Sequence, residues 1–522
     1  QQCFECGPYD NLDDNVFTIA MFCITPDYAS RSLDMMAAAF DHFVDKTYCV
    51  ITMPHDVAEI PLLQHFTKVS SKTGSNLPHE MWIMHKHGLL IDITVRPFEE
   101  DDREGIVALT NNIEGNELIS ADLDRVATSG VDPDGTMVGA YVAMSCDKIV
   151  GVVVCRSAQE DAAQLRAHYN IEEYILYLQH RTFEQGHLNH FILNPIFERH
   201  SKLVLREAMR LAGMSCIYHR IYTQDDDATR PMPYTVPTIL DSMIPVRHRR
   251  QIDYPNNVLK SNVPSLRVRH CDPPFALTFL NRKLMLESKI GINLRIVVVG
   301  NSDTALSFLE SMFMKPHLRF TNLTLITPGG LPGDLHNGQP NFLSTTHAWS
   351  GATRKRVSWG TWVNIVDDKL ITIDRDERMV QLASGAVVAY DYLVLAPDLK
   401  YDVATAASAK GAVAPLHVDV INSFADAQLY RTWIRGTFMG LSGQMIVYGG
   451  GVDAFAAVDS LLKLGVPPSR ITQIMATHTP EGFGNTQAAT LVLETTRGVG
   501  VEVVCGQTLV EWGRLSENDD QL

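Results

Sequence analysis

The sequence predicts an α/β protein that is divided into several domains. Its 522 residues exceed the length that one hydrophobic core usually supports, and 45% of them are hydrophobic, which is enough for several cores. Short apolar strands alternate with helices of period 3.6, and one strand–helix–strand order occurs twice. Later in the chain, two apolar strands each run into a glycine turn followed by a helix, which is typical of a βαβ unit.

Composition and charge exclude several classes of function. The net charge of −16 opposes binding to nucleic acid, and no apolar run reaches the eighteen residues of a membrane-spanning helix. We therefore expect neither nucleic acid nor a membrane among the partners. Nine scattered cysteines favour a reducing compartment such as the cytoplasm, and a lone pair at Cys3 and Cys6 lacks the four ligands of a zinc site, so no metal is expected.

The amino terminus, Gln1 to Cys6, has neither the basic start nor the apolar stretch of a signal peptide. The first residue is not methionine, and the last residues follow closely on a segment that reads as a strand. We therefore expect the sequence to be a fragment of a longer protein.

The repeated order is seen first near the amino terminus. The first copy is expected as strand, helix, strand and short helix at 15–24, 29–44, 48–51 and 57–65. The second copy is expected as strand, helix and strand at 187–193, 202–211 and 216–221. A strand at 93–98, an acidic helix start and a hairpin precede the second copy. The hairpin strands are expected at 137–143 and 149–154, with the turn at Asp147-Lys148.

This order resembles that of the GNAT (Gcn5-related acetyltransferase) family, and the V-R-P-F-E-E-D-D segment that begins at Val95 is similar to that family's first strand and helix. The resemblance implies that residues 1–88 are the C-terminal half of a GNAT-like domain and that 89–225 form a second GNAT-like domain. GNAT enzymes hold the pyrophosphate of acetyl-CoA on amides of a glycine-containing loop at a helix start. The corresponding stretches, 25–30 and 194–201, lack glycine and carry Asp27 and Glu198, so we expect them to repel that ligand.

Residues 226–274 are rich in proline, which opposes helices and interior strands, so we expect a connecting region there. Basic clusters lie at 247–250, 267–270 and 354–356. These clusters are either solvated loop charge or docking points for an acidic partner.

The first glycine turn follows the apolar strand at 295–299 and leads into a helix at 306–312. Of the G-x-G-x-x-G pattern of Rossmann-type domains only Gly300 is present, because Ser302 occupies the second position and Ala305 the third. Ser302 would obstruct the approach of a phosphate, and the next strand ends without the acidic residue that holds a ribose hydroxyl.

The second glycine turn is closer to the pattern. Gly449, Gly451 and Ala454 satisfy G-x-G-x-x-A between an apolar strand and a helix that runs to Leu464. The following strand ends at Ala476-Thr477-His478, which provides neither an acid for NAD nor an arginine for NADP. We expect the six positions of the two turns to be vestigial cofactor positions, where FAD or NAD binds weakly or not at all. Under the structural alternative, which we favour, the glycines serve only tight turns and close packing.

The last two regions together resemble the pyridine nucleotide-disulphide oxidoreductase family. The segment from Tyr390 to Ala396 is similar to its Y-D-x-L-x-x-A-T-G motif, although Pro397 and Asp398 replace threonine and glycine. The resemblance implies a degenerate FAD-type Rossmann-like domain at 275–440 and an incomplete NAD-type domain at 441–522. No cysteine lies between Cys271 and Cys505, which excludes the dithiol mechanism of that family, and no catalytic residue is expected.

The order of these modules, together with the stretch from Ala276 to Glu287 that leads into Ile292–Gly300, resembles the cilia- and flagella-associated protein 61 family. The resemblance implies a non-enzymatic scaffold in the axoneme of cilia and flagella, at the base of a radial spoke, needed for spoke assembly and motility. It implies as partners the other subunits of the calmodulin- and spoke-associated complex, the radial-spoke proteins and, indirectly, the doublet microtubule. Two alternatives remain: a flavin- or nicotinamide-dependent oxidoreductase, and an acetyltransferase.

Overall fold

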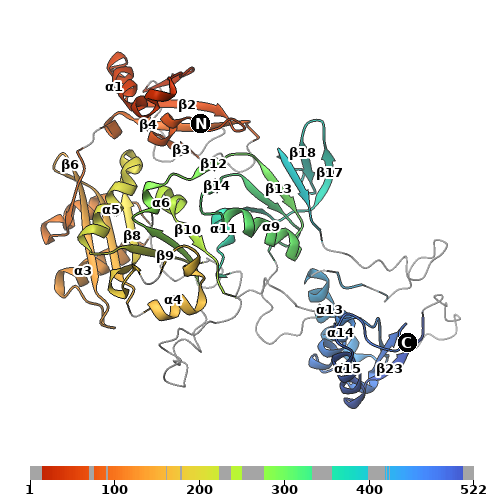
Figure 1. Ribbon diagram of the computed structural model, residues 1–522. Helices are drawn as coiled ribbons and strands as arrows, with labels where there is room; N and C mark the ends of the chain where they lie inside the picture. The colour runs from red at the N-terminus through yellow and green to blue at the C-terminus, as the bar shows by residue number, and fades with distance from the viewer. Residues whose placement is uncertain are drawn as a thin grey trace. The chain divides into compact units, whose positions relative to one another are not determined.

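The computed structural model describes residues 15–508, except for 70–75, 90–91, 114, 160, 177–178, 223–234, 236, 250–274, 332–341, 343–354, 398–417, 419 and 423. The chain is a mixed α/β protein with several sheets, as the sequence predicts (Figure 1). It divides into two compact units. The first comprises the described residues of 1–299, 304–327 and 352–395, and the second those of 300–303, 328–351 and 396–522.

The first sheet of unit one has four strands in the order β1-β2-β4-β3. They are β1 (Val16–Ile19), β2 (Tyr48–Pro54), β3 (Thr67–Val69) and β4 (His79–His85). Strand β1 is parallel to β2, and the other pairs are antiparallel. Helix α1 (Ser32–His42) packs Met36 and Phe40 against the sheet. The single helix expected at 29–44 is divided, because Pro26 opens a separate 3-10 turn, η2 (Pro26–Arg31), before α1.

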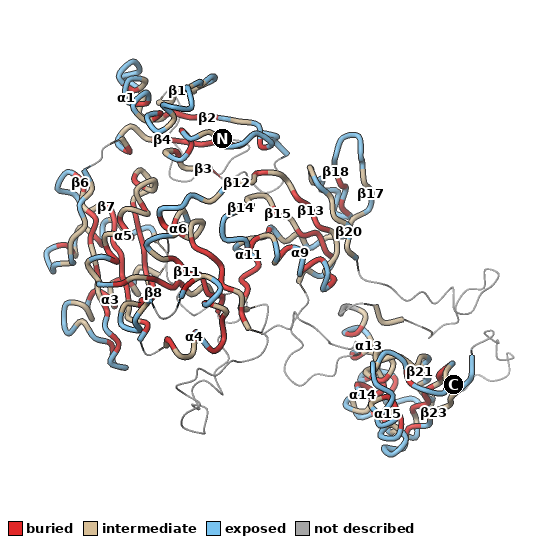
Figure 2. Tube along the Cα trace, viewed as in Figure 1, coloured by how far each residue is buried: buried red, intermediate tan, exposed pale blue. Residues whose placement is uncertain are grey.

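The second sheet of unit one has seven strands in the order β10-β11-β9-β8-β7-β6-β5. They are β5 (Thr94–Pro97), β6 (Val138–Ser145), β7 (Lys148–Ser157), β8 (Gln185–Leu193), β9 (Cys216–Tyr222), β10 (Ile244–Val246) and β11 (Phe275–Asn281). Only β8 and β9 are parallel. Both faces of the sheet are covered, so its central strands are almost entirely buried (Figure 2).

Five helices accompany this sheet: α2 (Arg103–Thr110), α3 (Asn116–Thr128), α4 (Ala162–His168), α5 (Ser201–Leu211) and α6 (Pro237–Ser242). Helices α2 and α3 pack on one face through Ile106, Ile119 and Leu123. Helix α5 packs on the other face through Val204 and Leu205.

Two expectations for this region require correction. The hairpin turn is Cys146-Asp147, one residue earlier than expected, and both residues have positive φ, of 49° and 60°. Two positive-φ residues give the twist that a two-residue hairpin needs, so Lys148 instead pairs with Ser145 in the ladder. Strand β11, expected to begin the third region at 275, pairs with β9 and β10 and therefore belongs to the seven-stranded sheet.

The proline-rich region was expected to be a connection without regular structure, yet its described part contains α6 and β10. Pro237 is the first residue of α6, where no amide donor is required. Pro245 lies in β10, the outermost strand of the sheet, where its missing N–H leaves no ladder bond unmade. Both prolines thus occupy positions that regular structure tolerates.

The rest of unit one contains a parallel sheet in the order β16-β15-β13-β20. Its strands are β13 (Ile296–Val299), β15 (Leu323–Ile326), β16 (Asn364–Val366) and β20 (Tyr392–Leu395), and helix α9 (Asp303–Phe313) follows β13. An antiparallel sheet, β17 (Leu370–Asp374), β18 (Met379–Leu382) and β19 (Val387–Ala389), packs beside it. A short pair, β12 (Ile290–Ile292) and β14 (Leu318–Phe320), and the turn α11 (Trp359–Trp362) complete this region.

Unit two contains the parallel sheet β21-β22-β23. Its elements are β21 (Met445–Tyr448), α14 (Val452–Lys463), β22 (Ile471–Met475), α15 (Thr486–Gly498) and β23 (Glu502–Cys505), preceded by α13 (Phe424–Gly436). The alternation of strand and helix agrees with the expected βαβ pattern. The core lies between the sheet and helices α13 and α14, around Ala427, Val458 and Leu461.

Candidate functional site

The two glycine turns expected to hold a dinucleotide differ in their geometry. At the first turn, Gly300 has φ +107°, and an added Cβ would lie 2.5 Å from the carbonyl oxygen of Ala396 and 2.7 Å from the Cα of Pro397. The Ser302 hydroxyl donates to the same carbonyl at 2.6 Å. Ala305 is completely buried in α9. Packing against Ala396 and Pro397 therefore accounts for Gly300, and the hydroxyl of Ser302 is bonded within the chain.

The second turn lies between β21 and α14. Gly449 has φ +146°, and an added Cβ would lie 3.2 Å from the Cβ of Ala454, so the backbone requires glycine at 449 and a small residue at 454. Gly451 is the N-cap of α14, with an ordinary φ of −84° and ψ of 173°. No atom lies within 4 Å of a Cβ added to Gly451. Packing therefore does not account for this glycine.

Neighbouring segments hold the second turn in place. The amide of Glu481 donates to the carbonyl of Gly450 at 2.8 Å. The side chain of Gln473, completely buried in β22, donates to the carbonyl of Gly449 at 3.1 Å. Sequence reasoning missed Gln473, although a glutamine in the middle of an apolar strand was the signal. A pocket with a volume of ≈ 520 Å³ lies at the start of α15, lined by residues that include Phe483, Asn485 and Thr486.

The fit of a dinucleotide also differs between the turns. The first does not fit, because the Ser302 side chain stands at the second motif position, where the backbone would need to approach a phosphate. The second leaves room beside Gly451, and the first amides of a helix have no intrahelical acceptor. The strand end that would meet a ribose, however, carries Thr477 and His478 in place of a carboxylate, and His478 packs against Gly506. The second turn could thus accept a phosphate but lacks a group to select a nucleotide.

The loop expected to repel acetyl-CoA in the second copy is folded as a 3-10 turn, η9 (Pro195–His200). Asn194 accepts a hydrogen bond from the amide of Ile196 at 3.1 Å. Burial, and secondarily the charge of Asp241, raises the pKa of Glu198 to about 7. At the start of α5, the hydroxyl of Ser201 accepts a hydrogen bond from Thr238 of α6 at 3.2 Å. The start of α5 is therefore occupied by the protein's own side chains.

Strands β8 and β9 pair only at Gln185–His187 and Cys216–Tyr218 and then diverge. Thr235 forms a bridge with Phe191 in the gap between them, and its hydroxyl lies 3.5 Å from Nδ1 of His219. Ile239 of α6, completely buried, joins the same core as Phe191. The gap is thus filled by the chain's own residues. In the first copy, Asp27 lies exposed on η2, which buries none of its residues.

A buried polar cluster that the sequence did not predict spans β8, β9 and the start of α4. Arg220 donates to Asp161 at 2.6 Å, and its Nη2 lies 2.9 Å from Nε2 of His187. Burial, followed by the charge of Arg220, lowers the pKa of His187 to about 4, so this imidazole is neutral at pH 7. The hydrogen bond with His187 and the charge of Arg220 lower the pKa of Asp161. With an arginine bound to both partners, the cluster is suited to holding the sheet together and not to proton transfer.

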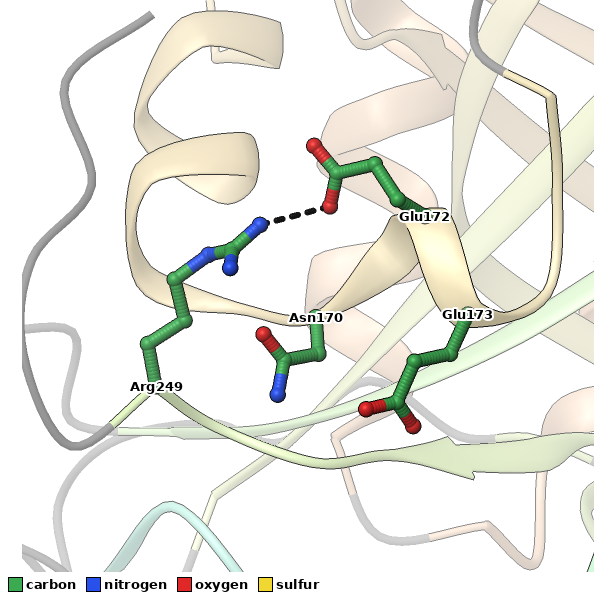
Figure 3. Close-up of a pocket in the computed structure, with 4 residues that line it drawn as sticks. All are labelled: Asn170, Glu172, Glu173 and Arg249. Carbon is green, nitrogen blue, oxygen red and sulfur yellow. Dashed lines mark hydrogen bonds and ion pairs between the residues drawn. The ribbon is translucent and has the colours of Figure 1, made fainter.

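Two arginines of the basic cluster at 247–250 have acidic neighbours within the chain. Arg249 donates to Glu172 at 2.6 Å and to the carbonyl of Arg166 at 3.2 Å (Figure 3). These contacts lie beside a pocket of ≈ 400 Å³ that is also lined by Asn170 and Glu173. Arg247 lies 3.7 Å from Glu310. Both arginines therefore form ion pairs within the chain. Arg250, the cluster at 267–270, Arg354, Asp398, Cys3 and Cys6 lie outside the described residues.

A second polar cluster joins the four-stranded sheet to the β12–β15 region within unit one. Lys68 of β3 contacts Glu80 at 3.1 Å and donates to Asn293 at 2.6 Å, and Asn322 donates to Glu80 at 2.8 Å. His55 lies 2.8 Å from Asp391, which also accepts from the amide of Arg295. These pairs are largely buried, so they fix the relative position of the segments that they join.

The residues that the structure describes offer neither a metal site nor a membrane-spanning helix. In that part of the chain, His, Cys, Asp and Glu side chains form no group that could hold a metal ion. The helices of the same part are all too short or too polar to cross a membrane.

No family model matches the sequence. Solved structures that are similar in fold include three reductases, each a weak match. The putidaredoxin reductase–putidaredoxin complex is 16% identical, with 44% of this chain and 53% of that chain covered and a TM-score of 0.30. The ferredoxin reductase of the CYP199A2 system from Rhodopseudomonas palustris is 14% identical, with 43% and 53% covered and a TM-score of 0.32. Reduced CoADR-RHD from Bacillus anthracis is 20% identical, with 43% and 40% covered and a TM-score of 0.32.

Among curated proteins, the chain is similar to cilia- and flagella-associated protein 61 of Tetrahymena thermophila. The two sequences are 29% identical over 408 residues, which cover 73% of this chain and 23% of the relative. The chain therefore spans less than a quarter of that relative's length. This match confirms the resemblance that the sequence shows.

Proposed function

We propose that this protein is a structural component of cilia and flagella. The observation that carries the proposal is the similarity to the cilia- and flagella-associated protein of Tetrahymena over 73% of the chain. Two features of the structure support a non-enzymatic role. The Ser302 side chain occupies the second position of the first turn, where a phosphate would approach, and Thr235 and Ile239 fill the gap between β8 and β9. An enzyme would need such spaces to admit a ligand.

The more specific form of the proposal is a scaffold subunit of the axoneme at the base of a radial spoke, needed for spoke assembly and beating. Its partners would be other subunits of the calmodulin- and spoke-associated complex, the radial-spoke proteins and, indirectly, the doublet microtubule. The internal ion pairs of unit one, such as Lys68 with Glu80, suit this role because they fix the segments on whose surfaces partners would dock. A protein of this kind acts through its surfaces and requires no catalytic group.

The test is rescue of a motility-deficient null strain with the full-length protein carrying Gly451→Asp. Because an added Cβ at 451 meets no neighbour, the fold tolerates this change, and aspartate is a favourable N-cap residue. Its carboxylate would nevertheless repel a phosphate at the start of α14. Gly451→Asn, similar in shape but neutral, is the matched control. We expect both variants to localise to cilia and to restore spoke occupancy and beating fully.

An oxidoreductase is the second candidate, and the open position at Gly451 is the observation that favours it. If Gly451→Asn rescues while Gly451→Asp assembles normally but leaves cilia immotile, a bound anionic cofactor is required and the scaffold proposal is wrong. If the tagged protein is absent from cilia altogether, the proposed location is wrong whichever variant is used.

A further inference from the structure

Two sheets of unit one share a single arrangement. In the first, the chain runs β1, α1, β2, a 3-10 turn, β3 and β4, and the strand order is β1-β2-β4-β3. In the second, it runs β8, α5, β9, α6, β10 and β11, in the order β8-β9-β11-β10. In each sheet the first pair is parallel and the other two are antiparallel. The repeat predicted from the sequence therefore extends to six elements, with β1 corresponding to β8.

The corresponding strands differ in what lies at their outer edge. Strand β8 pairs with β7 in antiparallel fashion from Gly151–Leu193 to Ser157–Gly186, and β7 is half of the β6–β7 hairpin. Strand β1 pairs with β2 alone among the residues that the structure describes. The first sheet thus lacks a counterpart of the strand that covers β8.

The burial of β1 and β8 agrees with this difference in strand pairing. Eight of the nine residues of β8 are buried, whereas the four residues of β1 are half-buried or exposed, and Met21 just beyond it is 89% exposed. Helix α1 leaves Met35 49% exposed, although the equivalent face of α5 packs against Val95 of β5. The apolar surface that the hairpin region covers in the second sheet is therefore uncovered in the first.

The outer strands of these sheets also differ in sequence. Proteins protect open strand edges with proline, with lysine or other charges, or with short strands. Strand β3 is three residues long and carries Lys68, β5 carries Arg96 and Pro97, and β10 carries Pro245. Strand β1, with the sequence Val-Phe-Thr-Ile, is also short at four residues, but it carries neither proline nor a charged residue. Of the four outer strands, only β1 retains the features of a strand that is paired.

We propose that the outer edge of β1 pairs with an antiparallel, apolar β-hairpin from elsewhere in the same protein, outside residues 1–522. The second sheet indicates the chemistry of the occupant, because β7 there is an antiparallel strand in which five of the ten residues are valine or isoleucine. It also indicates the source, because the β6–β7 hairpin belongs to the same polypeptide as β8. The curated relative provides room for such a segment, since the match covers only 23% of its length. The proposal is independent of the ciliary role.

The experiment places a photo-crosslinking amino acid at Thr18 of the full-length protein in ciliated cells and identifies the crosslinked peptide by mass spectrometry. Thr18 lies on β1 and its side chain is exposed, so the substitution leaves the core unchanged. Thr67 of β3, at the opposite edge of the same sheet, is the matched control. Because Thr67 pairs with Ile83 of β4, a crosslinker at Thr67 should react within residues 1–522.

We expect the Thr18 crosslink to join β1 to a peptide of the same protein outside residues 1–522, with the alternating apolar pattern of a strand. Crosslinking to residues 1–14, or to a different protein, would assign the edge to another occupant and overturn the proposal. A Thr18 position that gives no crosslink while Thr67 reacts would show that the edge is unpaired, which also overturns it. None of these outcomes depends on whether the protein supports motility.

Discussion

Gly300 is the first glycine of its turn and Gly451 the second glycine of the other turn, and the structure predicts opposite consequences for their substitution by alanine. Alanine at 300 would have to adopt φ +107° and would place Cβ 2.5 Å from a carbonyl oxygen. Strained backbone of this kind costs roughly 1–3 kcal/mol, and overpacking against backbone costs roughly 1–3 kcal/mol more. We therefore expect Gly300→Ala to destabilise its region by about 2–6 kcal/mol.

Alanine at 451 meets no neighbour and keeps an ordinary φ. Alanine reduces the conformational freedom of the unfolded chain, which stabilises the folded state by about 0.4–1 kcal/mol. Alanine is also a poorer N-cap residue than glycine, which destabilises the folded state by a few tenths of a kcal/mol or more. The free energy of unfolding should therefore change by no more than about 1 kcal/mol.

Differential scanning calorimetry together with amide hydrogen exchange across β13 and β21 would measure both variants. For a domain of this size, each kcal/mol of destabilisation lowers the melting temperature by roughly 2–4 °C. Gly300→Ala should therefore lower the melting temperature by about 4–24 °C. Gly451→Ala should change the melting temperature by less than about 4 °C. Equal destabilisation by the two substitutions would refute the assignment of Gly300 to packing and Gly451 to an open position. A shift below about 2 °C for Gly300→Ala would show that Ala396 and Pro397 do not press against the turn.

Three further predictions concern ligands and pH. The pKa of Glu198 is raised to about 7 by burial, so its folded form binds a proton more tightly than its unfolded form; stability should therefore rise as pH falls from about 7 towards the ordinary glutamate range. Glu198→Gln should flatten that rise in melting temperature, whereas Glu207→Gln, at a half-buried position of α5, should preserve it. Protein purified from native cilia should lack a stoichiometric flavin absorption band, because the Ser302 side chain stands where a phosphate would approach the first turn. A band near one flavin per chain would contradict this. Isothermal titration calorimetry should detect no micromolar binding of acetyl-CoA, because residues of α6 contact the start of α5 and fill the gap beside β8. If acetyl-CoA does bind, and Ile239→Trp abolishes that binding, then the gap is open and the prediction is wrong.

The sequence predicts the strands and helices of this protein well where the signal is local. Apolar alternation located β6 and β7, and glycine turns after buried strands located α9 and α14, because these features depend on neighbours in the chain. It does not predict the partners of β11. The strand was expected to open a new region, but it pairs with β9, more than fifty residues earlier, and such long-range pairing leaves no local signature.

The candidate site shows the same limit. Sequence could show that Ser302 departs from the glycine pattern, but not that its hydroxyl bonds to Ala396, ninety-four residues later. The sequence shows several prolines near residue 237, but it does not indicate that α6 fills the gap beside β8. The internal pairing of Arg249 with Glu172 was likewise invisible, since a basic cluster in a proline-rich stretch reads as exposed charge. In each case the missing information is a contact between distant segments.

The filling of the gap between β8 and β9 has a mechanical consequence. An enzyme that admits a ligand must retain an unfilled volume, and that volume lets the surrounding elements shift when force is applied. Close-packed protein interiors, by contrast, have low compressibility and transmit displacement. Thr235 forms a bridge with Phe191, and Ile239 lies in the same core. A force applied to α5 should therefore be transmitted to the sheet with little deformation of the module. In the ciliary role proposed above, a module of this kind would act as a stiff element that returns to the same geometry after every bending cycle.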